Sequence, residues 1–138
     1  MKKVLFFLAI SCLSLQSNNL SWASNYTITP TQLLKMIHYA QKPIILNMGE
    51  GGNKIKGSIP IGAFYDTLSL SKLKEVLSST PKSKQIVLYC GCCKFATCPN
   101  IKPAYDRVRS LGFINVKILY LPENFYTDWS QKGYPVEK

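Results

Sequence analysis

The stretch IVLYCGCCKFATCPN, residues 86–100, joins a short apolar run to four cysteines that lie within nine positions. Ile86–Tyr89 has the length and composition typical of a strand covered on both faces in a parallel sheet. Cys90 comes directly after it, at the carboxyl end where ligands and reactive groups collect in open parallel sheets. The stretch therefore predicts an α/β fold and places a thiol at its functional edge.

Apolar and periodic segments elsewhere predict strands that alternate with helices. Ile44–Met48 and Val116–Tyr120 predict two further buried strands, and Ile59–Tyr65 predicts a short extended segment. Four helices are predicted. The first begins after a Thr29 N-cap, which forms a capping box with Gln32, and the second covers Ser69–Ser79. The third runs from Pro99 or Asn100 to Leu111, and the fourth from Phe125 to about Gln131. This alternation implies parallel strands joined by right-handed crossovers, hence one α/β domain with helices on both faces of the sheet.

Residues 1–23, MKKVLFFLAISCLSLQSNNLSWA, have the layout of a secretory signal that is cut after Ala23. The apolar part is shorter than the about 20 residues of a permanent transmembrane helix. We therefore expect residues 24–138 to form a single exported domain, in the periplasm or secreted. The residues around Cys12 resemble a lipoprotein cleavage site, so we expect membrane attachment only if Cys12 is lipidated.

The charge balance is strongly basic, with 17 Lys and Arg against 7 Asp and Glu and a net charge of +10. Loss of Lys2 and Lys3 with the signal leaves 15 basic residues against 7, a net charge of +8. Such a surplus favours anionic partners in general. The lysines are nevertheless scattered, without the dense runs or interleaved aromatics of a nucleic-acid groove, so no nucleic acid partner is expected.

The four cysteines of residues 90–98 lie in one loop, unlike a disulfide framework that ties distant parts of a chain together. The loop leads from a strand end to the start of a helix, where backbone N–H groups carry partial positive charge. A thiolate is an anion, so the sequence predicts a lowered pKa for Cys90, with Lys94 adding to the field. The same reasoning predicts that Cys98, beside the helix start, is easily ionised.

Several segments around this loop follow one pattern. An apolar strand ends in Tyr-Cys, a helix leaves through Leu-Gly-Phe, an Asn-Val strand follows, and the chain closes on Trp and Gly-Tyr-Pro. These segments are Ile86–Cys90, Leu111–Phe113, Asn115–Leu119 and Trp129–Val136, and upstream Gly57–Ala63 is similar to Gly-His-Ile-Pro-Gly-Ala with one residue added. In this pattern the chain resembles the rhodanese-like sulfurtransferases over about residues 26–137.

The resemblance implies that Cys90 takes a sulfane sulfur from a small donor as a persulfide and passes it to an acceptor thiol, with no cofactor or metal. Backbone amides of the next loop residues would cradle the terminal sulfur: Gly91, Cys92, Cys93, Lys94, Phe95 and Ala96. The chain departs from the family pattern in that Asn47 and Gly49 replace an acidic residue and an arginine, and Ser58 replaces a histidine. The loop is also several residues longer.

Other chemistries remain open for these cysteines. Thiolates of Cys90, Cys92, Cys93 and Cys98 suit zinc or copper, although their spacing does not match the paired knuckles of structural zinc sites. Cys98 could instead act as a resolving or disulfide partner, in a thiol-disulfide exchanger or as a simple loop staple. Residues 90–100 contain no arginine to clamp an oxyanion, which argues against a phosphatase or arsenate reductase. The single histidine, His38, lies on the first predicted helix, away from any cysteine protease dyad.

Overall fold

The computed structural model describes residues 23–39 and 42–138, so residues 1–22 of the predicted signal segment 1–23, Cys12 among them, lie outside the described residues. A five-stranded sheet in the order β1-β6-β5-β2-β4 forms the centre of the domain, and every pairing in it is parallel. Its strands are β1 (Thr27–Ile28), β2 (Ile44–Asn47), β4 (Ile59–Pro60), β5 (Ile86–Tyr89) and β6 (Val116–Leu119). The predicted parallel α/β sheet is confirmed.

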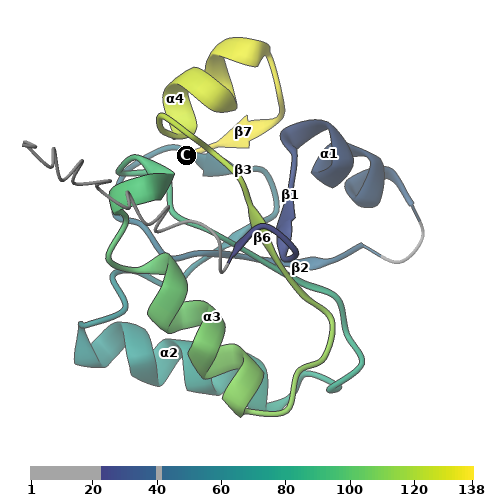
Figure 1. The fold of residues 1–138 in the computed structure, drawn as a ribbon, viewed down its shortest axis with the longest axis vertical. Helices are drawn as coiled ribbons and strands as arrows, with labels where there is room; N and C mark the ends of the chain where they lie inside the picture. Colours follow the sequence, from purple (N-terminus) through teal and green to yellow (C-terminus); the bar gives the residue numbers. More distant parts are fainter. Residues whose placement is uncertain (1–22, 40–41) are drawn as a thin grey trace, which may run out of the picture.

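Helices cover both faces of this sheet, as the sequence predicts. They are α1 (Pro30–His38), α2 (Thr67–Ser78), α3 (Ile101–Ser110) and the short α4 (Phe125–Asp128). Figure 1 shows α2 and α3 side by side on one face, with α1 and α4 on the opposite side of the sheet. This division is the three-layer arrangement expected when parallel strands are joined by helical crossovers.

The central strand β5 contributes to both layers because successive side chains of a strand point to opposite faces. Ile86 and Leu88 pack with residues of α2 and α3, whereas Val87 and Tyr89 pack with residues of α1 and α4. All four side chains are fully buried. The uninterrupted apolar run in the sequence is thus explained, since neither face of β5 meets water.

The helix starts follow local capping chemistry. The predicted capping box is present: the Gln32 backbone N–H donates to Thr29 Oγ1 at 3.2 Å, and the Thr29 N–H donates to Gln32 Oε1 at 2.7 Å. Helix α2 begins two residues before the predicted Ser69, because Asp66 caps it and accepts the Ser69 N–H at 3.0 Å. Helix α3 begins at Ile101, one or two residues after the predicted start.

Several short elements were not predicted. Strand β1 forms the sheet edge, and β3 (Lys54–Ile55) pairs antiparallel with β7 (Val136–Glu137) in a second small sheet, where Lys54 and Glu137 form an ion pair. A 3₁₀ turn, η2 (Phe95–Thr97), was also not predicted, whereas the helix predicted from Phe125 to about Gln131 is divided into α4, which ends at Asp128, and a second 3₁₀ turn, η3 (Ser130–Lys132). Each unpredicted element has only two or three residues, which is too short for a hydrophobic period to show in the sequence.

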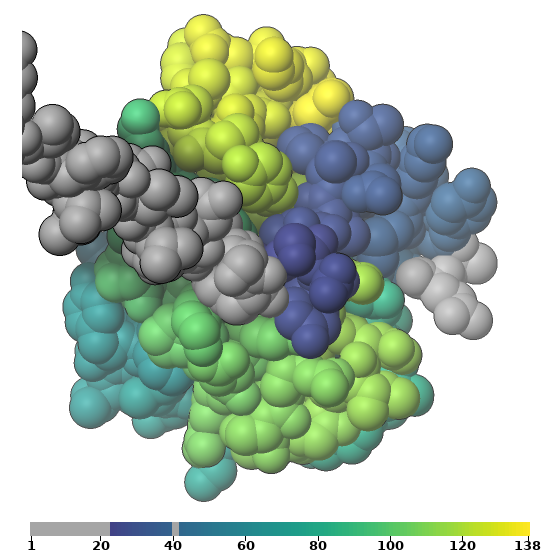
Figure 2. Space-filling view, in the orientation of Figure 1, coloured from purple at the N-terminus to yellow at the C-terminus, as the bar shows by residue number. Residues whose placement is uncertain are grey.

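The C-terminal segment closes over the layer that contains α1. In Figure 2 the yellow C-terminal segment and the blue α1 region lie side by side on the surface. Beneath them the Trp129 side chain is fully buried, and its indole N–H donates to the Pro135 carbonyl at 2.9 Å. Within residues 23–39 and 42–138, none of the helices has the length and apolar character needed to cross a bilayer.

The Tyr89 hydroxyl supports a first prediction. It accepts the Ile55 backbone N–H at 3.1 Å and lies 3.1 Å from Ser58 Oγ, all in buried surroundings. Tyr89→Phe leaves the Ile55 N–H without its partner, so we expect a loss of about 1–3 kcal/mol in the free energy of unfolding, measured by urea denaturation. Tyr126→Phe is the control because that ring is 64% exposed. Equal stability of the two variants would contradict the assigned role of the Tyr89 hydroxyl.

Candidate active site

Three of the four loop cysteines bring their sulfur atoms together at the end of β5. Cys90 Sγ lies 3.3 Å from Cys92 Sγ and 3.7 Å from Cys93 Sγ, and the latter two are 3.8 Å apart. All are free thiols. Cys90 is only 5% exposed, Cys93 is half-buried, and Cys92 is exposed. The sequence predicted the position of Cys90 but not this contact, which depends on the path of the loop. We call these three residues the thiol trio.

Cys98 lies just before α3, and its thiol has a lowered pKa. A hydrogen bond with Cys90 and backbone N–H groups of Asn100 and Ile101 lower the pKa of Cys98 to about 6, against the opposing effect of burial. The prediction from the helix start is confirmed in direction. At neutral pH the negative charge of the loop therefore lies on Cys98.

Cys90 behaves differently from its prediction. Its hydrogen bond with Cys98 and its burial raise the pKa of Cys90 far above the ordinary value, although the Cys92 backbone N–H acts in the opposite direction. The cause is that two neighbouring thiols cannot both ionise in a desolvated site without strong repulsion. Cys90 and Cys98 thus share one negative charge and one proton as a coupled pair, and Cys98 holds the charge at rest.

Cys93 remains a neutral thiol at physiological pH. Burial, followed by the proximity of Cys98, raises the pKa of Cys93 to about 12. Lys94, predicted to strengthen the field on the thiols, is 65% exposed and forms an ion pair with Glu123 at 3.0 Å. Its charge is largely screened there, so the Cys98 thiolate is stabilised mainly by its hydrogen bond with Cys90, followed by the backbone N–H groups at the start of α3.

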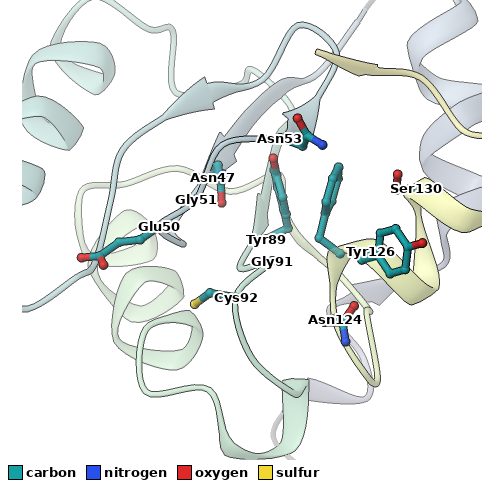
Figure 3. A pocket seen from close by; sticks show the side chains of 11 residues that line it. Asn47, Glu50, Gly51, Asn53, Tyr89, Gly91, Cys92, Asn124, Tyr126 and Ser130 are labelled. Atoms are coloured by element: carbon teal, nitrogen blue, oxygen red, sulfur yellow. The ribbon is translucent and has the colours of Figure 1, made fainter. Parts of the chain in front are cut away.

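A cavity of about 380 Å³ opens beside the trio. Of the loop cysteines in the described part of the chain, Cys92 is the one that lines it. The other lining residues are mainly uncharged: Asn47, Glu50, Gly51, Asn53, Tyr89, Gly91, Asn124, Phe125, Tyr126 and Ser130. Figure 3 shows Cys92 below Gly91, Tyr126 on the opposite wall, and the Glu50 side chain directed away from the aromatic wall. Cys92 is therefore the loop cysteine with direct access to this cavity.

Two glycines allow the surrounding segments to approach the cysteines closely. A Cβ on Gly49 would lie 3.0 Å from the Gly91 nitrogen and 3.3 Å from Cys90 Sγ, and one on Gly91 would lie 2.7 Å from Phe125 Cβ. Asn47, buried at the end of β2, accepts the Gly49 N–H at 2.9 Å and holds this turn in place. The residues that replace the charged pair of the rhodanese-like pattern thus give an uncharged, close-packed support.

Asn100 is a site residue that the sequence analysis placed only as a helix start. It is 3% exposed; its Oδ1 accepts the Phe64 N–H at 3.0 Å, and its Nδ2 lies 3.8 Å from Cys90 Sγ. Asn is common at helix starts as a cap, but this side chain makes no capping bond. Its position between α3 and Cys90 could not be inferred from the sequence, because Phe64 lies far away along the chain.

No protein-family model matches the sequence, and no curated protein matches it. Several solved structures have a similar fold. One is EanB, in a cysteine-to-serine variant, in complex with hercynine: the two sequences are 20% identical, the TM-score is 0.59, and the match covers 82% of this chain and 27% of that one. Another is the anaerobic ergothioneine biosynthesis enzyme from Chlorobium limicola with its natural substrate trimethyl histidine, which is 19% identical with a TM-score of 0.60; the match covers 82% of this chain and 28% of that one. A third is EanB with a cysteine persulfide in a tetrahedral intermediate state with ergothioneine, which is 20% identical with a TM-score of 0.59; the match covers 81% of this chain and 28% of that one. This chain thus spans little more than a quarter of each neighbour, and the likeness establishes the fold.

The charge on Cys98 leads to a second prediction. Because its pKa is lowered to about 6, the Cys98 thiolate is populated above that pH and lost below it. Alkylation of Cys98 by iodoacetamide should therefore be about tenfold faster at pH 7 than at pH 5, as followed by residue-resolved mass spectrometry. Cys98→Ser should abolish this step. A midpoint above pH 8 at Cys98 would contradict the stabilisation of its thiolate by α3.

Proposed function

We propose that this protein is a rhodanese-like sulfurtransferase that carries a sulfane sulfur as a persulfide on Cys90. The main support is the coupled pair at the end of β5: a buried thiol at the strand end shares one negative charge with Cys98, next to a cavity that admits a small molecule. Such a pair provides both the nucleophile and an acceptor for its proton.

In the proposed reaction, Cys90 attacks the outer sulfur of a donor such as a small persulfide, R–S–SH. The Cys90 proton moves to the Cys98 thiolate as the new S–S bond forms, the donor S–S bond breaks, and R–S⁻ leaves and is protonated. The Cys92 backbone N–H, already directed at the Cys90 sulfur, and the Asn100 amide 3.8 Å away are placed to stabilise charge there. An acceptor thiol then attacks the outer sulfur and regenerates the Cys90 thiol.

Two further observations support the proposal. Strand, cysteine, loop and helix follow one another as in the rhodanese-like pattern, and Ser58 occupies the position of the pattern's histidine while bonding Tyr89. One protein of similar fold, EanB, is described with a persulfide on a cysteine. We also propose export of the mature domain to the periplasm or medium, with a small sulfur donor and a thiol acceptor as partners.

The third prediction tests this function directly. Reduced protein treated with glutathione persulfide or thiosulfate should transfer sulfur to an acceptor thiol, and Cys90→Ala should reduce transfer to the background rate because the sulfur carrier is missing. Circular dichroism of Cys90→Ala checks that it folds. Full activity of Cys90→Ala would exclude Cys90 as the carrier.

Metal binding is a second candidate, favoured by the packing of the trio. The three sulfur atoms all lie within 4.8 Å of one another. Sulfurs around tetrahedral zinc, with Zn–S bonds of about 2.3 Å, are about 3.8 Å apart, close to the separations of 3.3–3.8 Å in the trio. Cys90, Cys92 and Cys93 would then be ligands, and metal would compete with persulfide formation.

The fourth prediction separates the candidates. If the trio is a metal site, reduced protein should bind one equivalent of Zn²⁺ or Cu⁺ against a competing chelator, and Cys92→Ser and Cys93→Ser should weaken binding about equally. Elemental analysis of the dialysed protein measures the stoichiometry. Sulfur transfer by metal-free protein that takes up no metal would exclude this candidate.

A further inference from the structure

The thiol trio determines what happens to a persulfide after it has formed. The Sγ atom of Cys90 becomes the inner sulfur of a Cys90 persulfide, and the Sγ atoms of Cys92 and Cys93 lie 3.3 and 3.7 Å from it. These are contact distances for sulfur atoms, so an attacking thiol is already beside the persulfide before any acceptor arrives. This step rests on the proposed function, because it requires that Cys90 accepts sulfur.

We propose that Cys92 resolves the Cys90 persulfide inside the protein, so that the site releases its sulfur as sulfide and is left as a Cys90–Cys92 disulfide. Cys92 Sγ attacks Cys90 Sγ, the S–S bond to the outer sulfur breaks, and HS⁻ leaves. The proton of Cys92 passes to solvent, to which its side chain is exposed. The sum is Cys90–S–SH plus Cys92–SH giving the disulfide plus H₂S; the Cys92 sulfur is oxidised by one electron, the outer sulfur is reduced by one, and the Cys90 sulfur keeps its oxidation state.

Geometry favours Cys92 over the other cysteines. Within the trio, Cys92 Sγ is nearer to Cys90 Sγ, at 3.3 Å against 3.7 Å for Cys93, and Cys92 alone of the trio is exposed. Cys93 Sγ lies farther from Cys90 Sγ, at 3.7 Å, and its side chain is half-buried, so it is less free to move into line for attack. A bond between Cys92 and Cys93 is disfavoured, since adjacent residues have Cα atoms about 3.8 Å apart and disulfides usually need about 4.4–6.8 Å.

Cys98, the partner suggested by the sequence, is better suited to hold the proton. Its thiolate is held by Cys90 and by the backbone N–H groups of Asn100 and Ile101. These hydrogen bonds keep the negative charge of the coupled pair on Cys98, which is therefore the acceptor of the Cys90 proton. Cys98 also lies outside the set of three cysteines whose sulfurs are mutually within 4.8 Å. It therefore accepts the Cys90 proton in the uptake step and leaves the resolving step to Cys92.

The disulfide defines the partner class. To turn over again, the site needs two electrons from an external reductant, and Cys92 lines the open cavity where such a reductant can attack. A dithiol suits this step because its second thiol resolves the mixed disulfide formed with Cys92. The net reaction is then R–S–SH plus a dithiol giving R–SH, H₂S and the oxidised dithiol. When no acceptor thiol takes the outer sulfur from Cys90, the protein would act as a dithiol-dependent reductase of sulfane sulfur, with sulfide as its product.

The fifth prediction is tested by a single turnover. Fully reduced protein, freed of reductant, is mixed with one equivalent of glutathione persulfide, and sulfide and intact mass are followed together. The parent protein should release about one equivalent of sulfide and lose about 2 Da. Cys92→Ser should gain about 32 Da and release sulfide at least about tenfold more slowly, because the persulfide forms but is not resolved. Dithiothreitol, but not an equal thiol concentration of 2-mercaptoethanol, should then give repeated turnover of the parent.

Two comparisons make the outcome decisive. A stable gain of 32 Da in the parent protein would overturn internal resolution while leaving sulfur uptake by Cys90 intact. If Cys93→Ser or Cys98→Ser accumulates the persulfide and Cys92→Ser does not, the assignment of Cys92 is wrong. If neither the parent nor Cys92→Ser gains sulfur, releases sulfide or loses mass, the proposed function itself fails.

Discussion

The burial of β5 between two helical layers is the constraint on which the rest of the structure depends. Ile86–Tyr89 has no exposed side chain, so the strand runs through the centre of the domain and delivers Cys90 to its carboxyl edge already out of water. Desolvation at this edge destabilises the thiolate relative to the neutral thiol and so raises the pKa of a cysteine there. The loop that follows must therefore provide compensation, and it does so at the start of α3, where Cys98 meets two backbone N–H groups.

The negative charge that Cys90 and Cys98 share organises the candidate site. Burial and the neighbouring Cys98 keep Cys90 and Cys93 protonated, while the hydrogen bond with Cys90 and the backbone N–H groups at the start of α3 make Cys98 the anion. Each cysteine then differs from the others in a property that matters for sulfur chemistry: burial, charge or access to the cavity. This division separates the carrier of sulfur, the acceptor of its proton and the thiol exposed to a reductant, although all four lie within one loop.

Around the site, uncharged and closely packed residues stand at positions where the rhodanese-like pattern has charged ones. Asn47 and Gly49 stand where the rhodanese-like pattern has a charged pair, and the turn they form lies against Gly91 with no room for a side chain. On the other face, Tyr89 and Ser58 bond each other and anchor Ile55. Neutral hydrogen bonds of this kind avoid the desolvation penalty of a buried ion pair. They also leave the thiols as the main titratable groups at the strand end.

The sequence alone determined the features that depend on short stretches of chain. These are the apolar run of β5, the capping box at Thr29, the alternation of strands with helices, the cysteine at a strand end and the ease of ionising Cys98 beside a helix start. Tertiary structure alone decided which cysteine sulfurs are in contact and which thiol lines the cavity. It also decided that the pKa of Cys90 rises rather than falls, and that Asn100 accepts a hydrogen bond from the Phe64 N–H beside the site. The physical reason is that periodicity and capping are local, whereas sulfur contacts and desolvation depend on segments brought together only when the layers pack.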